Sequence, residues 1–397
     1  MRPLPSDPVL FTLASRQIWP QVLGVLHLRP ARLVLLHSAD RLESKGPAQR
    51  LKRFFDKNDL LPKGGTTMEE IPYDDFEGIL RRLDSLEADP ARSLLHFTGG
   101  NKLMAMAAFR WAIRRAIPCF YWERGNRLTW FFGRGEEVET DSAGVDVGIA
   151  DALDPLDLLR CQIDASEVER NGELLRLNTQ GARIPLEELS ARCARGEDLR
   201  GLLSIAERSE GDRQEKEGNR LEYNAAVVLL RLGVRCVRRS LRLKVKSGTG
   251  ISTSRPHEEI DLLFNHGGRL WQVDCKDRKP PEQLAEELEA RLRRKNVLPC
   301  PDIASLLERI RSELTIQQVK ALKLDLLSVQ DSGGLLGRTV CVRRVPMAEE
   351  VEQYARQKGI DVVLASELVD GLRALLDPGR SATPGELSDL QRRFARP

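Results

Sequence analysis

The chain is poor in the side chains that build metal clusters and disulfide frameworks. Its 397 residues include seven cysteines and five histidines, and no two cysteines form a Cys-x-x-Cys pair. This pattern gives no zinc cluster and favours a reduced protein, so we expect a cytoplasmic location. No apolar run approaches the roughly 20 residues that cross a bilayer. The N-terminus has no basic region followed by an apolar one, so we expect neither a membrane span nor a secretory signal.

The chain also lacks a large net charge of either sign. The 62 Lys and Arg residues balance 59 Asp and Glu residues, which leaves a formal charge of +3. This balance excludes a wholly basic coating protein and an acidic disordered chain, although a local basic surface remains compatible with it. With 41% hydrophobic and 30% charged residues the composition is that of a globular protein, and the length predicts two or three domains.

The first 145 residues alternate short apolar runs with helical patterns. Runs typical of buried strands lie at 9–13, 32–37, 93–97 and 119–122. Apolar residues with helical spacing occupy 17–28 and about 102–115. Short buried strands that alternate with helices predict a mostly parallel sheet covered on both faces, a Rossmann-like α/β domain over residues 1–145. Ligands of such sheets bind beyond the carboxyl ends of the strands.

Two further parts follow this domain. Residues 146–206 contain short helical patterns and one candidate hairpin, punctuated by Asp154-Pro155 and Ile184-Pro185. We interpret them as a helical connector, with a small winged-helix-like module as the alternative. A highly charged stretch then opens the third part, residues 207–397, where a helical run ends at Gly233.

Residues 257–279, HEEIDLLFNHGGRLWQVDCKDRK, have the pattern of a β-hairpin. Two strand-like runs flank Gly267-Gly268, and this pair favours a tight turn because both residues tolerate positive φ. With the turn centred there, Asp261 opposes Asp274. Side chains alternate along a strand, so the two carboxylates point to one face and apolar side chains point to the other.

The opposed carboxylates of Asp261 and Asp274 imply a cation. Carboxylates across a strand pair lie about 5 Å apart and repel, unless a cation lies between them or one is protonated. Mg²⁺ and Mn²⁺ prefer oxygen ligands, and a lysine such as Lys276 on the same face can stabilise charge at phosphorus. Glu222, on the preceding helix, adds a third carboxylate. The alternatives are a surface hairpin with solvated charges and a first-turn glutamate that favours the helix dipole.

These residues resemble the PD-(D/E)xK nuclease superfamily. The match is a helix with Glu222, then Asp261, then Asp274-Cys275-Lys276, while Ile260 stands where the superfamily name has proline. The resemblance implies a restriction-endonuclease-like α/β fold and metal-dependent cleavage. The implied metal ligands are Asp261, Asp274, Cys275 through its carbonyl, and Glu222. The implied catalytic residues are Asp261, Asp274, Lys276, Glu222 and Glu259, the last as a partner of Lys276.

A basic strand precedes the hairpin. Residues 231–246, RLGVRCVRRSLRLKVK, hold seven basic side chains and no acidic one. Alternation puts Arg242, Lys244 and Lys246 on one face, which suits the sequence-independent attraction of a phosphate backbone. The alternative is an edge strand whose charges prevent aggregation.

A glycine-rich turn opens the helix that begins near residue 102. The sequence His96-Phe97-Thr98-Gly99-Gly100-Asn101-Lys102 follows a strand, and free N–H groups at a helix start together with a lysine form an anion site. The turn lacks the Gly-Lys-Ser/Thr end of a P-loop, so it is not interpreted as an ATP site. The alternative is a turn that uses glycine only for its backbone angles.

Thr-Gly-Gly-x-Lys-x-Met after a sheet strand resembles the signature of CRISPR-associated Rossmann-fold (CARF) domains. Asn101 stands where that family commonly has threonine. The resemblance implies a homodimer that senses cyclic oligoadenylates. The implied ligand-binding residues are Ser15, Gln17, Ser38, Thr98, Gly99, Gly100, Asn101, Lys102 and Met104.

A CARF-like domain followed by a PD-(D/E)xK-like domain resembles the ancillary nucleases of type III CRISPR systems. The resemblance implies activation by cyclic tetra-adenylate, Mg²⁺ or Mn²⁺ as cofactor, and non-specific cleavage of DNA, RNA or both. Two other functions stay open. One is a cyclic-nucleotide-responsive DNA-binding transcriptional regulator without cleavage activity, and the other is a restriction or repair nuclease whose N-terminal domain binds a protein partner.

Overall fold

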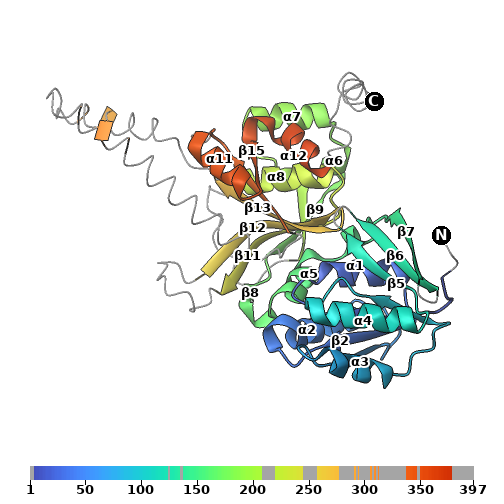
Figure 1. The fold of residues 1–397 in the computed structure, drawn as a ribbon. Helices are drawn as coiled ribbons and strands as arrows, with labels where there is room; N and C mark the ends of the chain where they lie inside the picture. The colour runs from blue at the N-terminus through green and yellow to red at the C-terminus, as the bar shows by residue number, and fades with distance from the viewer. Residues whose placement is uncertain are drawn as a thin grey trace, which may run out of the picture. The chain divides into compact units, whose positions relative to one another are not determined.

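Two β-sheets organise the computed structural model of the chain, one in each of two units (Figure 1). The structure describes residues 4–123, 126–134, 137–207, 220–244, 257–276, 337–346 and 349–377, with a few isolated positions between 290 and 312. The first unit is Met1–Val168 with Asn265–Leu270 and Ser332–Gly337. The second is Glu169–Phe264 with Trp271–Asp331 and Arg338–Pro397. Within the described residues, every helix is too short or too polar to cross a bilayer.

The first unit contains a seven-stranded sheet with the order β3-β2-β1-β4-β5-β6-β7. Its strands are β1 (Val9–Leu13), β2 (Arg32–His37), β3 (Thr66–Glu70), β4 (Ser93–His96), β5 (Cys119–Glu123), β6 (Arg127–Arg134) and β7 (Glu137–Gly144). Its helices are α1 (Trp19–Leu28), η1 (Arg41–Lys45), α2 (Gly46–Lys57), α3 (Phe76–Asp84), α4 (Lys102–Arg114), η2 (Ala150–Ala152), α5 (Pro155–Gln162) and η3 (Ala165–Glu167). Strands β1 to β5 pair in parallel, whereas β6 and β7 are antiparallel. The predicted mostly parallel α/β sheet is confirmed.

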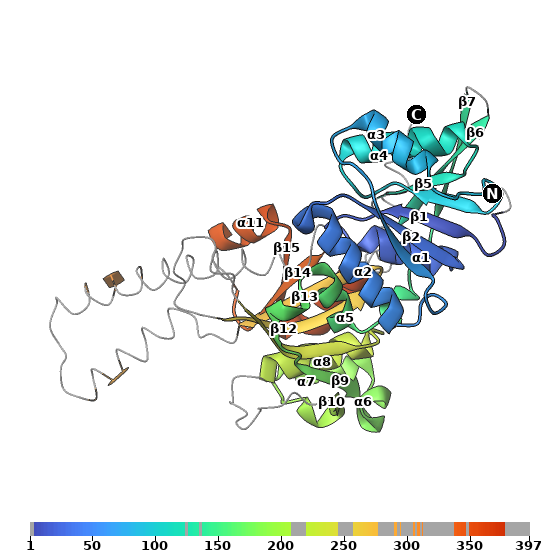
Figure 2. The ribbon, with the colours of Figure 1, turned by 90° about the horizontal axis from the view of Figure 1, so that it is seen from below.

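Helices cover both faces of this sheet because its central strands are apolar on both sides. Phe11 and Leu13 of β1 share a buried cluster with residues of α3 and α4. The alternate residue Leu10 is equally buried on the other face, as is Leu33 of β2. Figure 2 shows α1 and α2 on the side of the sheet away from α3 and α4. Two-sided burial explains why the strands have continuous apolar sequences.

The second unit contains an eight-stranded sheet with the path β10-β9-β11-β12-β13-β14-β15, and β8 pairs with β11. Its strands are β8 (Val168–Arg170), β9 (Glu173–Leu177), β10 (Leu203–Glu207), β11 (Val237–Lys244), β12 (His257–His266), β13 (Arg269–Lys276), β14 (Arg338–Arg343) and β15 (Ile360–Leu364). Its helices are α6 (Thr179–Arg183), α7 (Leu186–Ala194), η4 (Arg200–Leu202), α8 (Arg220–Arg231), α11 (Glu349–Gln357), η6 (Ala365–Glu367) and α12 (Leu368–Leu376). Strands β9 and β10 come from the predicted connector, and they are part of this sheet.

Helix α8 lies on the main core of the second unit. One buried cluster joins α7, α8 and α12 to the sheet through residues such as Leu262, Val273 and Val342. A smaller cluster joins Cys341 of β14 to Val351 and neighbouring residues of α11. Alternation along β14 therefore sends Val342 to the α8 face and Cys341 to the α11 face. The hairpin strands β12 and β13 thus share this core with α8 through Leu262 and Val273.

Candidate active site

The predicted hairpin is present. Strands β12 and β13 are neighbours in the sheet, and Gly267 and Gly268 between them have φ values of 61° and 69°. Two consecutive positive φ angles are those of a type I′ turn, which matches the twist of the flanking strands. The rings of Phe264 and Trp271 stack at 5.7 Å with an interplanar angle of 12°. This stacked pair fits the register in which Asp261 opposes Asp274.

Asp261 lies at the centre of the charged residues. Its Oδ2 accepts a hydrogen bond of 2.6 Å from the backbone N–H of Cys275. Burial raises the pKa of Asp261 well above its usual range, and the charges of Asp274 and Glu222 raise it further. The N–H of Cys275 and the charge of Lys276 act in the opposite direction. The fold has therefore brought the three predicted carboxylates into electrostatic contact.

Asp274 and Lys276 form an ion pair within one strand. Lys276 Nζ lies 2.6 Å from Asp274 Oδ1, and both side chains are at most one-fifth exposed. Cys341, which β14 places opposite Asp274, directs its thiol to Asp274 Oδ2 at 3.9 Å. Residues two apart in a strand share a face, so the Asp-x-Lys spacing produces this pair directly.

Glu222 reaches the same group of residues from α8, and a buried arginine holds it. Glu222 Oε2 accepts a hydrogen bond of 3.1 Å from Arg239 of β11, which also binds Glu173 of β9. Burial raises the pKa of Glu222 to about 7, against the opposing effect of Arg239. Arg239 and Glu173 were not found by sequence reasoning. The pattern that could have indicated Arg239 is its place at an otherwise apolar position of the basic strand.

The remaining charged residues of the prediction lie at the edge of this group. Glu259 is exposed and opposes Arg242 in the pairing of β12 with β11, while its charge raises the pKa of Glu222. Arg242 and Lys244 are both exposed, as the alternation of the basic strand predicts. Lys246 lies outside the described residues.

The oxygen donors of the hairpin suit a hard divalent ion. Asp261 and Asp274 supply carboxylates, and the backbone carbonyl of Cys275 is a third oxygen donor of the kind that Mg²⁺ and Mn²⁺ prefer. Among the described residues, no three His, Cys, Asp or Glu side chains are grouped as a ready-made metal cage. Mg²⁺ in proteins usually keeps several waters and takes one or two carboxylates, so two carboxylates and a carbonyl satisfy this requirement.

The predicted ligand residues of the first unit lie at one edge of its sheet. Strands β2, β1 and β4 are adjacent and parallel, so their carboxyl ends meet at the same edge. Ser15 and Gln17 follow β1, Ser38 follows β2, and Thr98 follows β4. Lys102 begins α4 with an exposed side chain at this edge, whereas Ser38 is buried.

The glycine turn is shaped by close backbone contacts. A Cβ atom on Gly99 would lie 2.1 Å from the carbonyl oxygen of Leu13, and Gly100 has a φ of 74°. The side chain of Asn101 caps α4, because its Oδ1 accepts a hydrogen bond of 2.8 Å from the N–H of Met104. The side chain of Met104 is only 1% exposed and packs in the core. Both glycines are therefore required by the backbone, and Asn101 performs the capping that threonine would.

The hydroxyl of Thr98 is engaged by protein groups on two sides. It accepts a hydrogen bond of 2.6 Å from the N–H of Trp122 and lies 2.8 Å from Nε2 of His96. Burial lowers the pKa of His96 to about 3, so the ring is neutral. Its Nε2 can therefore accept a hydrogen bond from the Thr98 hydroxyl. The other ring nitrogen lies 3.1 Å from the hydroxyl of Thr12. Contact between Thr98 and a ligand stays a prediction.

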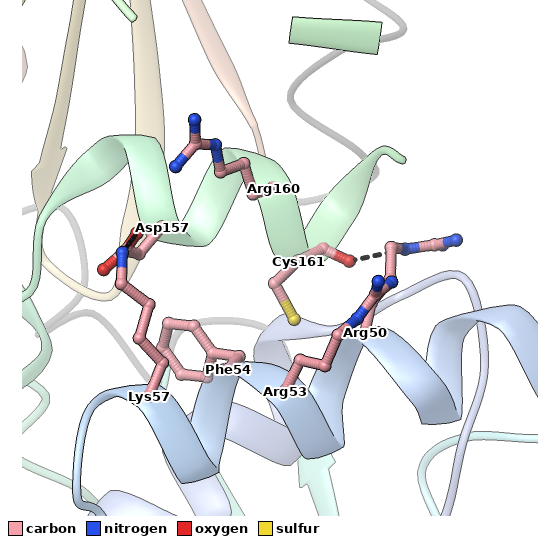
Figure 3. A pocket seen from close by; sticks show the side chains of 7 residues that line it. All are labelled: Arg50, Arg53, Phe54, Lys57, Asp157, Arg160 and Cys161. Atoms are coloured by element: carbon pink, nitrogen blue, oxygen red, sulfur yellow. Dashed lines mark hydrogen bonds and ion pairs between the residues drawn. The ribbon is translucent and has the colours of Figure 1, made fainter. Parts of the chain in front are cut away.

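A cavity of about 130 Å³ lies between α2 and α5 of the first unit (Figure 3). Its lining side chains are Arg50, Arg53, Phe54, Lys57, Asp157, Arg160 and Cys161. Arg50 donates a hydrogen bond of 2.9 Å to the carbonyl of Cys161, and Lys57 pairs with Asp157 at 2.5 Å. These contacts join α5 to α2. Arg50 and Lys57 thus have structural partners within the unit.

Comparison with known proteins identifies the fold. No family model matches the sequence, and no curated protein matches it. Can2 from Sulfobacillus thermosulfidooxidans, solved in complex with cyclic tetra-adenylate, superposes with a TM-score of 0.53 over 92% of this chain and 98% of Can2, at 15% identity. Protein VC1899 from Vibrio cholerae superposes with a TM-score of 0.58 over 94% of this chain and 98% of its own, at 14% identity. The chain therefore has the fold of these two proteins over nearly its whole length.

Proposed function

We propose that the chain is a metal-dependent endonuclease that cyclic tetra-adenylate activates in type III CRISPR antiviral defence. The observation that carries this proposal is the hairpin on which Asp261, Asp274 and Lys276 meet, with Glu222 beside them. Support comes from the fold, which is shared with Can2, a protein solved with cyclic tetra-adenylate bound. The substrate is DNA, RNA or both, cut in the cytoplasm without sequence preference.

The residues of the hairpin have distinct roles in this proposal. Asp261, Asp274 and the carbonyl of Cys275 hold Mg²⁺ or Mn²⁺, with Glu222 as a direct or water-mediated ligand. The bound ion supplies an activated water and polarises a phosphoryl oxygen. Lys276, which Asp274 holds at 2.6 Å, keeps a positive charge where negative charge develops on the phosphate.

The basic strand attracts the substrate in this proposal. The exposed side chains of Arg242 and Lys244 lie on β11, which pairs with the β12 strand of the hairpin. Lysine and arginine bind phosphates through charge and carry no sequence information. Binding should therefore weaken steeply with added salt and depend little on base sequence.

The activator site is proposed at the carboxyl edge of β2, β1 and β4. Phosphate groups would meet the start of α4 and the exposed charge of Lys102, where the helix dipole also favours anions. The remaining residues of this proposed site are Ser15, Gln17, Ser38, Thr98, Gly99, Gly100, Asn101 and Met104. Two copies in a homodimer would share one ring, and the ring shifts a closed–open equilibrium only if it binds one state more tightly.

The proposal is tested by cleavage of single- and double-stranded DNA and RNA, with and without cyclic tetra-adenylate, in Mg²⁺ and in Mn²⁺. We expect cleavage only when both the activator and a divalent ion are present. Asp274→Ala should abolish cleavage while the protein still binds the activator in calorimetry. Equal cleavage without activator would contradict the gating, and cleavage in excess EDTA would contradict the metal.

The transcriptional regulator and the partner-binding nuclease are distinguished by the same experiments. A regulator would bind a specific duplex without a metal ion and without cutting it. The regulator hypothesis used residues 150–205 as a winged helix, but β9 and β10 from this segment belong to the eight-stranded sheet. A repair nuclease with a protein-binding first unit would cut nucleic acid yet bind no cyclic oligoadenylate.

A further inference from the structure

Arg239 of β11 joins two buried carboxylates, those of Glu173 and Glu222. Its side chain is 3% exposed and donates from Nε and Nη2 to Glu173 Oε2, at 3.0 and 2.8 Å. Its Nη1 donates to Glu222 Oε2 at 3.1 Å. The guanidinium also lies 4.2 Å from the ring centroid of Tyr223, the residue after Glu222. The arginine is therefore fixed on three sides.

The partner that orients this arginine comes from the sheet itself. Arg239 of β11 opposes Glu173 of β9 in the antiparallel register, so the two side chains meet on one face of neighbouring strands. Glu173 is also buried, at 5% exposure. A guanidinium presents several donors in a rigid plane, and two donors on one carboxylate oxygen leave the Nη1 edge aimed at a second acid. Glu222 is that acid.

Only one of the two oxygens of Glu222 is used by Arg239. Oε2 receives the hydrogen bond, and the charge of the carboxylate acts on Asp261. The charge of Lys276 in turn acts on Glu222. The other oxygen of Glu222, Oε1, thus accepts no hydrogen bond from Arg239, and the carboxylate interacts electrostatically with Asp261 of the hairpin.

We propose that Arg239, oriented by Glu173, positions Glu222 so that its second oxygen serves the divalent ion of the nuclease site, directly or through a water. This inference rests on the proposed function. Arg239 is a positioning residue, since it acts through Glu222. Groups that orient a metal ligand from behind typically change metal affinity or activity by about 10- to 100-fold when they are removed.

The backbone beside Arg239 has an unusual conformation that supports a specialised role for this part of β11. Ser240 has a φ of 54°, and it lies between the pairs Arg239–Leu262 and Leu241–Ile260, opposite Asp261. A residue other than glycine at positive φ is strained, and such residues cluster at functional sites. Ser240 therefore adjoins Arg239 and lies opposite Asp261 in the strand register.

The test is the binding of Mn²⁺ by the full-length protein, measured by electron paramagnetic resonance in the absence of nucleic acid. Arg239→Lys keeps one charge but loses the planar fork, so we expect the Mn²⁺ dissociation constant to rise about 10- to 100-fold. Glu173→Gln retains the shape and one acceptor oxygen but loses the charge, and it should raise the constant by a smaller factor. Cleavage by both variants should be restored in part by higher Mn²⁺ concentrations.

The matched control is Arg238→Lys. Arg238 is the neighbouring buried arginine on β11, and it pairs with Glu207 at 2.7 Å. This variant should bind Mn²⁺ like the wild type. Equal Mn²⁺ affinity in wild type, Glu173→Gln and a folded Arg239→Lys would overturn the inference while leaving the nuclease proposal intact. Failure of the wild type to bind Mn²⁺ or to cleave would instead overturn the proposed function itself.

Discussion

Lys276 Nζ lies 2.6 Å from Asp274 Oδ1, so a cation and an anion two residues apart neutralise each other on one face of β13. The pair leaves the second oxygen of Asp274 to the weak donor Cys341. Asp261, in contrast, receives a backbone N–H, and its charge is opposed by two other carboxylates. The ion pair with Lys276 therefore compensates the charge of Asp274, whereas the pKa of Asp261 is raised well above its usual range despite its hydrogen bond from Cys275.

Loss of the lysine charge should impair the chemical step. We expect Lys276→Ala to lower kcat by about 10²- to 10³-fold, the usual effect of removing one group that stabilises transition-state charge. Activator affinity should be unchanged in calorimetry. The control is Lys52→Ala, because Lys52 forms a surface pair with Asp56 at 2.8 Å in the first unit. Cleavage by Lys276→Ala at the wild-type rate would refute the role of this residue.

The buried carboxylates should make metal-free stability depend on pH. Burial in the folded state raises the pKa of Glu222 from its ordinary value of 4.5 to about 7 and also raises that of Asp261, so the folded state binds these protons more tightly than the unfolded chain. The contribution of Glu222 to stability is complete below pH ~4 and is lost as pH rises through about 7, and Asp261 acts in the same direction, with a slope of up to about 1.4 kcal/mol per pH unit for each proton.

Asp261→Asn tests this dependence, because the amide keeps the shape and loses the charge. In urea unfolding with EDTA, the variant should gain stability relative to wild type as pH increases from 5 to 8. Mn²⁺ at pH 8 should raise the Tm of the wild type more than that of the variant, since the ion offsets the repulsion. A constant difference between the two proteins across this pH range would contradict the prediction.

The backbone at Gly99 should not tolerate a side chain. Gly99→Ala would place a methyl group 2.1 Å from the Leu13 carbonyl, so β1 or the turn must move, at a cost of about 1–3 kcal/mol. We expect a lower Tm and a loss of activator binding in calorimetry. In Gly144→Ala the added methyl group meets no atom within 4 Å, and this control should behave like wild type. Normal activator binding by Gly99→Ala would mean that the turn does not form the site.

The exposed charge of Lys102 at the start of α4 should contribute to activator affinity and leave the stability of the ligand-free protein unchanged. Lys102→Ala should weaken binding of cyclic tetra-adenylate by about 10- to 100-fold, the usual value of a hydrogen bond to a charged group. The Tm without ligand should stay the same, because the side chain is exposed. Arg114→Ala, at the other end of the same helix, is the matched control. Equal affinity in both variants would place the activator elsewhere.

Local patterns predicted the elements that carry the site. The Gly-Gly turn, the alternation along the hairpin and the Asp-x-Lys spacing each depend on neighbours in sequence, and the structure forms all three. The sequence did not predict the buried pair of Glu173 and Arg239, because these residues are 66 positions apart and meet only through the order β9-β11. The burial of Met104 is different, because the helical periodicity of α4 could have indicated that this side chain faces the core.

The sequence by itself determined the two α/β patterns, the glycine turns and the hairpin that carries Asp261, Asp274 and Lys276, because φ preference and side-chain alternation act over a few residues. The tertiary structure decided which charges meet. Strand order and register bring Arg239 between Glu173 and Glu222. Burial and the charge of Glu259 raise the pKa of Glu222 above that of an ordinary first-turn glutamate. Coulomb interactions and desolvation depend on distance and environment in space, and spacing along the chain specifies neither.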